Sequence, residues 1–81
     1  NKLEINFSTS AAGHIRIGFQ TADGSPLEGY SVDACDELIG DELDRIVTWN
    51  GSSDVSSLVG KPIRMRFVMK EADVYALQFR E

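Results

Sequence analysis

Apolar and polar residues alternate with a period of two over long stretches at both ends of the chain. This pattern is typical of β-strands with one buried and one solvated face, because successive side chains of a strand point to opposite sides. Near the end of the chain the pattern occupies about residues 62–70 and 73–80. Near the start, its apolar members are Leu3, Ile5, Phe7, Ile15, Ile17 and Phe19. These stretches are therefore predicted to be strands with one apolar face each.

Short turn signals separate the predicted strands. The sequence SAAG at residues 10–13 predicts a turn with Gly13 at positive φ, which glycine adopts without steric strain. Residues 2–8 and 14–20 are therefore expected to pair as an antiparallel hairpin. The strands near the end of the chain are expected to be joined in the same way, by a tight turn at residues 71–72.

The middle of the chain is less regular. A short strand is expected around residues 28–32, and the sequence RIVTW at residues 45–49 predicts another. After these strands, Asp54 is suited to cap the free amides of a single helical turn. Gly60 suits the left-handed position that ends such a turn, and Pro62 prevents its continuation.

These elements predict an all-β fold with several short strands and one short helical turn. A single sheet would leave an apolar face in water, so the strands are expected to form a small two-sheet antiparallel β-sandwich, jelly-roll-like in kind. With 81 residues the chain can build one thin core, and residues 1–81 are expected to be a single domain. The chain begins at Asn1, without an initiator methionine, and is expected to be a fragment of a larger protein.

Charge and hydropathy argue against two classes of partner. The net charge is −5, whereas a protein that binds nucleic acid presents a basic face to the phosphates. No apolar run approaches the roughly 20 residues that span a bilayer, so no membrane partner is expected. Cys35 is the single cysteine and lies among acidic neighbours, which raise the pKa of a thiol. It is expected to be a free, slow-reacting thiol that fills space in the core.

No catalytic, cofactor-binding or metal-binding residue is assigned from the sequence motifs. The densest acidic cluster is either a solvated acidic loop or a calcium site, although the spacing of its carboxylates matches no EF-hand. Paired carboxylates also hydrolyse glycosides, but they need a concave site for which a thin sandwich has little room. The isolated domain is therefore expected not to be an enzyme. The members of the acidic cluster are Asp33, Asp36, Glu37, Asp41, Glu42 and Asp44.

Two aromatic residues, Trp49 and Tyr30, are candidates for contact with carbohydrate, because sugar rings stack on exposed aromatic faces. In the strand predicted at residues 45–49, Trp49 shares a face with Val47, which favours a core position for the indole. The position of Tyr30 stays open at this point.

Three arginines are candidates for an interface. Arg16, Arg64 and Arg66 all occupy outward positions of their predicted strands, and would form one basic strip if these strands share a sheet. Arginine is favoured at protein interfaces, because its planar fork pairs with carboxylates and its flat face stacks on aromatic rings. The alternative is that these arginines are simply the solvated side of the strands.

Three stretches of the chain carry a family resemblance: STSAAGHIRI (residues 8–17), GSSDVSSLVGKPIRMRF (residues 51–67) and ADVYALQF (residues 72–79). Through them the chain resembles, over nearly its whole length, a C-terminal β-sandwich module of bacterial proteins similar to glycoside hydrolases of families 32 and 43. In those proteins a five-bladed β-propeller precedes the sandwich. The propeller holds the catalytic carboxylates, so the resemblance transfers no catalytic residue to this chain.

The resemblance implies a non-catalytic accessory domain at the C-terminus of a secreted or periplasmic hydrolase. Such a domain would pack on an upstream propeller domain of the same chain and stabilise it. The alternative is a carbohydrate-binding module that brings the parent enzyme to a polysaccharide. The scarcity of aromatic residues outside the predicted core faces favours the accessory role.

Overall fold

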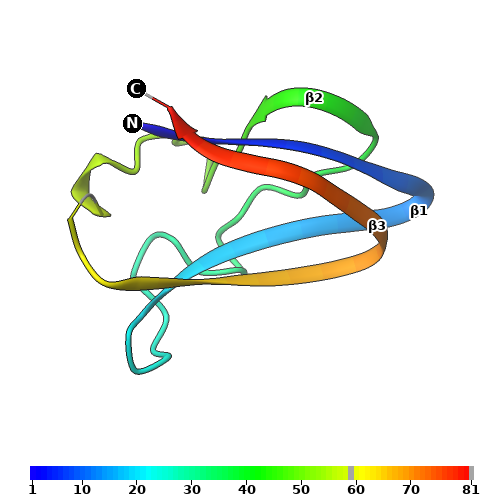
Figure 1. Ribbon diagram of the computed structural model, residues 1–81. Helices are drawn as coiled ribbons and strands as arrows, with labels where there is room; N and C mark the ends of the chain where they lie inside the picture. The colour runs from blue at the N-terminus through cyan, green and yellow to red at the C-terminus, as the bar shows by residue number, and fades with distance from the viewer. Residues whose placement is uncertain (59, 81) are drawn as a thin grey trace.

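The computed structural model describes residues 1–58 and 60–80, and its elements are almost entirely strands (Figure 1). The strands form one antiparallel sheet with the order β2-β1-β3. The prediction of an all-β fold with one helical turn is confirmed. None of the described residues forms a helix long and apolar enough to cross a membrane. The elements are β1 (Lys2–Thr21), β2 (Asp41–Ile46), the 3-10 turn η1 (Ser56–Leu58) and β3 (Ile63–Arg80).

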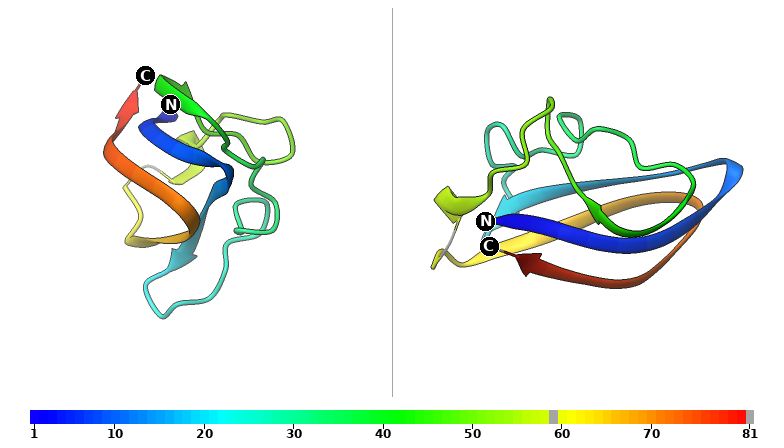
Figure 2. Two further views of the ribbon diagram at one scale, coloured as in Figure 1. Left: turned by 90° about the vertical axis from the view of Figure 1, so that its right-hand side faces the viewer. Right: turned by 90° about the horizontal axis from the view of Figure 1, so that it is seen from above.

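β1 and β3 form one long antiparallel ribbon, which is bent in the middle and folded over on itself (Figures 1 and 2). The pairing runs from Lys2 opposite Arg80 to Thr21 opposite Ile63. The first half of β1 therefore faces its own second half across the core. The two layers of the molecule are halves of one sheet, in place of the two separate sheets that were expected.

The hairpins expected at the two ends of the chain do not form. Residues 2–8 and 14–20 belong to the same strand, and each pairs with a different half of β3. Likewise, residues 63–80 run through the expected turn at residues 71–72 as one strand. Alternation determines which face of a strand is apolar, but it does not determine which strand becomes the neighbour.

The bend depends on a close approach of the two backbones at Gly13. A Cβ atom at this position would lie 2.5 Å from the carbonyl oxygens of both Lys70 and Glu71, so only glycine fits. Glu71 has a φ of 47°, in the left-handed region. β1 also uses more residues than β3 at this point, because Thr9 pairs with Ala72 and the next pair is formed by residues 14 and 70. Gly13 therefore serves a bend within a strand, and the turn predicted at residues 10–13 is wrong.

The middle of the chain contributes more core than strand. Residues 28–32, expected to be a strand, form a loop. β2 begins at Asp41 and ends at Ile46, so it shares only residues 45–46 with the strand predicted at residues 45–49. The rest of that segment still enters the core, where Val47 and Trp49 are buried.

The core lies between the inner face of β1 and the parts of the chain directly before and after β2. Six apolar residues on the inner face of β1 are at most 1% exposed: Leu3, Ile5, Phe7, Ile15, Ile17 and Phe19. We call residues 35–58 the covering segment, because they supply the opposite side of this core. Trp49 packs against Phe19 with ring centroids 5.3 Å apart, and its Nε1–H donates a hydrogen bond of 2.8 Å to the carbonyl oxygen of Ile17. The buried residues of the covering segment are Cys35, Leu38, Val47, Trp49, Val55 and Leu58.

Candidate docking surface

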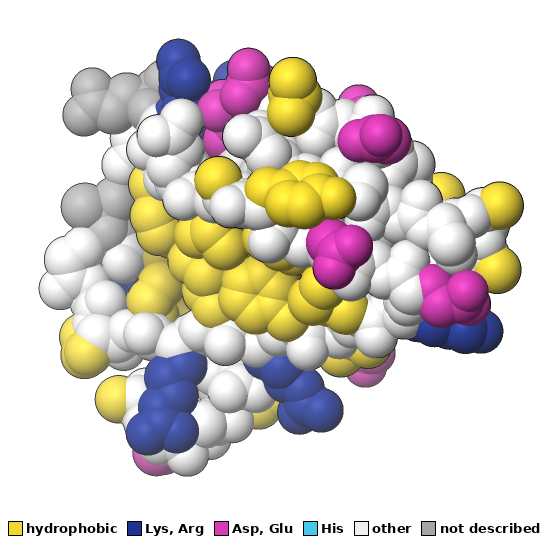
Figure 3. All heavy atoms as spheres, turned by 45° about the vertical axis from the view of Figure 1, so that its right-hand side comes forward, with side chains coloured by type: hydrophobic (Ala, Val, Ile, Leu, Met, Phe, Trp, Pro, Cys, Tyr) yellow, Lys and Arg dark blue, Asp and Glu magenta, His cyan; other side chains and the backbone are white. Residues whose placement is uncertain are grey.

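The inner face of β3 is not covered as the inner face of β1 is. Residues directly opposite each other in an antiparallel pair share one face, so the inner side of β3 follows from its register with the buried residues of β1. We call the exposed part of this inner side the open face. Figure 3 shows it as a broad hydrophobic area in the hollow between the two layers. Its members are Phe67 (37% exposed), Met69 (41%), Leu77 (37%) and Phe79 (51%).

The open face is continuous with the core. Phe79 stacks on the buried Phe19 with ring centroids 6.1 Å apart. Ile63, Met65 and Val74, on the same side of β3, are partly buried against the core cluster. The hydrophobic surface of the open face is thus an extension of the core to solvent, in contrast to isolated apolar residues on a polar surface.

An apolar hollow lies at one end of the open face. Its volume is about 450 Å³, and η1 and the two ends of β3 surround it. Val55, Leu58, Ile63 and Phe79 supply its apolar walls. The hollow is large enough to accept a side chain of a partner.

Tyr75 departs from the alternation of its neighbours. The sequence places it on the apolar face with Leu77 and Phe79, but it is 66% exposed and its hydroxyl lies 2.7 Å from the hydroxyl of Ser8. The reason is a register shift at Phe7, which inserts one residue into β3 and turns Tyr75 to the outer face.

The three candidate interface arginines lie in one sheet, as their common basic strip requires. Arg66 pairs with Gly18 in the register and Arg64 with Gln20, beside Arg16 on the outer face of β1. Arg16 is paired with a carboxylate of the chain itself, Glu37, at 3.2 Å. None of the ion pairs among residues 1–58 and 60–80 includes Arg64 or Arg66.

A groove of about 550 Å³ lies on this outer face, between the second half of β1 and the loop that crosses it. His14, Arg16, Glu37 and Arg66 contribute its polar lining. The loop approaches so closely that a Cβ atom at Gly18 would lie 2.5 Å from the amide nitrogen of Val32. The groove is open and has both polar and apolar walls, and the ion pair of Arg16 with Glu37 in it joins residues of the chain itself.

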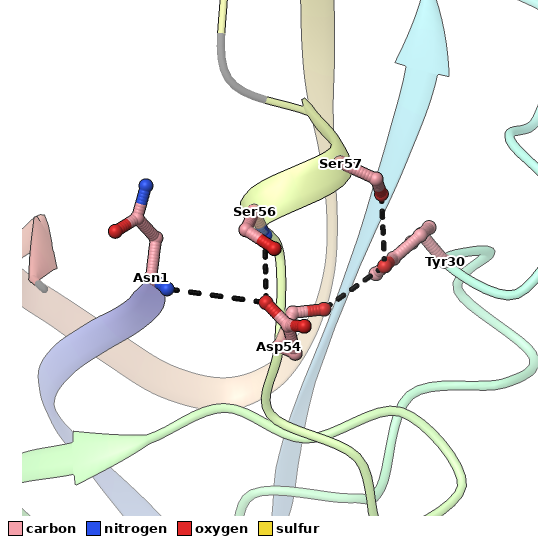
Figure 4. A network of polar contacts seen from close by, with 5 residues as sticks. All are labelled: Asn1, Tyr30, Asp54, Ser56 and Ser57. Carbon is pink, nitrogen blue, oxygen red and sulfur yellow. Dashed lines mark hydrogen bonds and ion pairs between the residues drawn. The ribbon is translucent and has the colours of Figure 1, made fainter.

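The two candidate aromatic residues for carbohydrate contact lie against the core. Trp49 is 2% exposed, so neither face of its indole is free for a sugar ring. The half-buried ring of Tyr30 meets Trp49 edge-on at 5.7 Å between centroids. Its hydroxyl donates a hydrogen bond of 2.9 Å to the carbonyl oxygen of Asp54 and lies 3.3 Å from the hydroxyl of Ser57 (Figure 4).

Asp54 caps η1, as the sequence predicts. Its Oδ1 accepts a hydrogen bond of 2.9 Å from the backbone N–H of Ser56 and lies 3.9 Å from the terminal amine of Asn1 (Figure 4). Hydrogen bonds from Ser56 lower the pKa of the Asp54 carboxyl. The capped turn places Val55 and Leu58 against the core.

The carboxylates of the predicted acidic cluster are spread over separate contacts. Asp36 accepts hydrogen bonds from the hydroxyl of Thr48 and from the backbone N–H of Gly51, and these lower its pKa. Glu42 pairs with Arg45 in β2. Within the described ranges, no three Asp, Glu, His or Cys side chains come together as a metal site.

Cys35 is a free, buried cysteine, as predicted. Burial raises the pKa of its thiol, and Asp36 adds to the effect. The backbone N–H of Ile17 donates a hydrogen bond of 3.3 Å to its Sγ. Cys35 therefore lies in the core of the molecule, away from the open face.

One buried charge, Glu4, has no signal in the sequence pattern. Glu4 is 7% exposed although it lies on the outer side of β1. Gln78 donates a hydrogen bond of 3.1 Å to its Oε1, and Arg80 pairs with it at 3.4 Å. These contacts join the two ends of the chain. The period-two pattern gives no sign of them, because it marks Glu4 simply as a solvated position.

No family model matches this chain, and no curated protein or solved structure matches it significantly. The fold and the surface define the class: a small all-β domain with an apolar face that residues 1–58 and 60–80 leave exposed.

Proposed function

We propose that this chain is a non-catalytic accessory domain of a glycoside-hydrolase-like protein, in which it packs on a catalytic propeller domain and stabilises it. The open face of β3 is the observation that carries the proposal. Contiguous apolar surface that extends from a core is typical of a protein–protein interaction site. A domain that is always docked keeps this surface out of water.

Three carboxyl groups of the chain stabilise loops. The pKa values of Asp23, Asp36 and Asp54 are all lowered, chiefly by hydrogen bonds from neighbouring hydroxyl and amide groups. A carboxyl group of this kind holds its loop in place.

The test compares two single changes in the full-length parent protein. Phe67→Ser removes an aromatic ring from the open face, and Tyr75→Ser removes one from the outer face. The proposal predicts that Phe67→Ser lowers the melting temperature of the propeller domain and that Tyr75→Ser leaves it unchanged. Both variants are also melted as isolated domains, so that a loss of domain stability is separated from a loss of docking.

Binding of each variant to insoluble polysaccharides is measured in parallel. If the parent melts unchanged with Phe67→Ser while retention on a polysaccharide disappears, the accessory role is wrong. The carbohydrate-binding alternative then replaces it.

A further inference from the structure

We infer that the partner covers the open face by adding an extended strand to the free edge of β3 along Ile63–Lys70, and that apolar residues alternate with Asp or Glu in this strand. The inference rests on the proposed function, because it specifies how the same surface is covered. It adds the direction of approach and the chemistry of the partner segment.

One edge of β3 is free. β3 pairs with β1 along one side, and no other strand within residues 1–58 and 60–80 pairs with its second side. No residue of β3 takes part in the backbone hydrogen bonds that the loops and turns of the described chain form. At 18 residues β3 is much longer than a typical strand of about 5–6 residues. A long free edge with unpaired N–H and C=O groups is a template for another strand.

The inner side of this edge is apolar. An added strand would place alternate side chains beside Met65, Phe67 and Met69, since neighbouring strands share their faces. These side chains would cover the part of the open face that belongs to the first half of β3. The apolar hollow of about 450 Å³ at the start of β3 would take an apolar residue at the end of the added strand.

The outer side of this edge is positively charged. The outer side of the same segment carries Arg64, Arg66 and Lys70, on a chain whose net charge is −5. None of the three belongs to an ion pair within the described part of the chain. Opposite charges on neighbouring strands stabilise the pairing and like charges destabilise it. The outward residues of the added strand are therefore Asp or Glu.

A second copy of the chain fits this edge less well. Antiparallel pairing of two Ile63–Lys70 segments would set the cations of one copy against the same cations of the other. The acidic strand β2 is the other edge strand of the sheet, but Asp44 at a φ of 57° interrupts its extended backbone, and Glu42 is already paired with Arg45. The charge pattern therefore favours a strand from a different polypeptide segment.

The test uses a synthetic nonapeptide in which Val and Ile alternate with Glu, added to the isolated chain and followed by amide resonances and hydrogen exchange. Two control peptides carry Lys in place of every Glu, or N-methyl groups on alternate backbone amides. The inference predicts that the Glu peptide binds at least about tenfold more tightly than the Lys peptide, because it gains opposite charges in place of like ones. It should protect amides of Ile63–Lys70 from exchange.

Arg64→Glu combined with Arg66→Glu should reverse this preference without unfolding the chain, and N-methylation should abolish binding. Equal binding of the Glu and N-methylated peptides would overturn strand addition. This result would leave the accessory role intact, because that role is tested by Phe67→Ser in the parent. Failure of the Glu peptide to bind would also overturn the inference. The inference would likewise be wrong if sedimentation shows that the chain associates with itself and this association protects the amides of β3.

Discussion

β1 and β3 are strands of the same kind, but the inner face of β1 is largely buried and that of β3 is largely exposed. They have 20 and 18 residues, pair with each other from end to end except at the bend and at Tyr75, and carry the same alternation of apolar and polar side chains. Yet Ile15 is fully buried, while Met69, directly opposite it, is 41% exposed. The difference lies in the rest of the chain, because the covering segment packs over β1 and leaves much of the inner face of β3 exposed (Figure 2). Alternation makes one face of a strand apolar, but another segment has to pack on this face to bury it.

The covering segment is held over β1 by specific hydrogen bonds. The indole of Trp49 donates to a carbonyl of β1, and the carboxylate of Asp36 joins two loops of the covering segment through Thr48 and Gly51. Among the described residues, the side-chain hydrogen bonds and the ion pair of β3 go to β1, and none goes to the covering segment. The closed and the open side of the molecule should therefore respond differently to the same kind of change.

The largest expected difference is between Ile15→Ala and Met69→Ala. Removal of the fully buried Ile15 side chain leaves a cavity and should lower the free energy of unfolding by about 2–5 kcal/mol. Met69→Ala should lower it by about 1 kcal/mol, because the part of the side chain that is already in water contributes little. Urea unfolding of both variants measures the contrast. Equal losses would show that β3 is as well packed as β1.

A smaller effect is expected from Gly13→Ala, at the bend that both strands share. In a regular strand this change would stabilise the fold, because alanine restricts the unfolded chain. Here the added Cβ would collide with the carbonyl oxygens of Lys70 and Glu71, so a loss of more than about 1 kcal/mol is expected. Ala12→Gly, at an exposed neighbouring position, is the control in the same denaturant assay. Stabilisation by Gly13→Ala would contradict the folded ribbon.

The smallest effect concerns the attachment of the covering segment and depends on pH. Hydrogen bonds hold the pKa of Asp36 below its ordinary value of 3.8, so its charged form stabilises the folded state. This contribution is complete above the unfolded-state pKa and is lost as the pH falls through the lower, folded-state pKa. Asp36→Asn should therefore reduce stability at neutral pH and flatten its fall in acid. Asp33→Asn, at an exposed side chain of the same loop, is the control, and thermal melts from neutral pH down to about pH 2 compare the variants.

The features that the sequence predicts correctly are local ones. The period of two identifies the strands and the inner face of β1, and the position of Asp54 identifies the capped turn, because neighbours in the sequence determine both. The partner of each strand and the bend at Gly13 depend on contacts between distant residues, so a single sequence does not contain them in readable form.

The sequence predicts the open face only in part, for the same reason. The sequence shows that Phe67 and Leu77 belong to an apolar face, but only the packing of the covering segment shows that this face stays exposed. Tyr75 is the exception among the strand residues, since one register shift moves it to the other side.

Hydroxyl-radical footprinting of the native chain tests the contrast between β1 and β3 most directly. The chain is labelled at a concentration where sedimentation shows a monomer, and modification of each side chain is measured by mass spectrometry. The account predicts rapid modification of Met69 and Phe79 and protection of Phe7 and Phe19, which are at most 1% exposed. Protection of Met69 and Phe79 equal to that of Phe19 would contradict an open face on β3 and remove the basis for docking there.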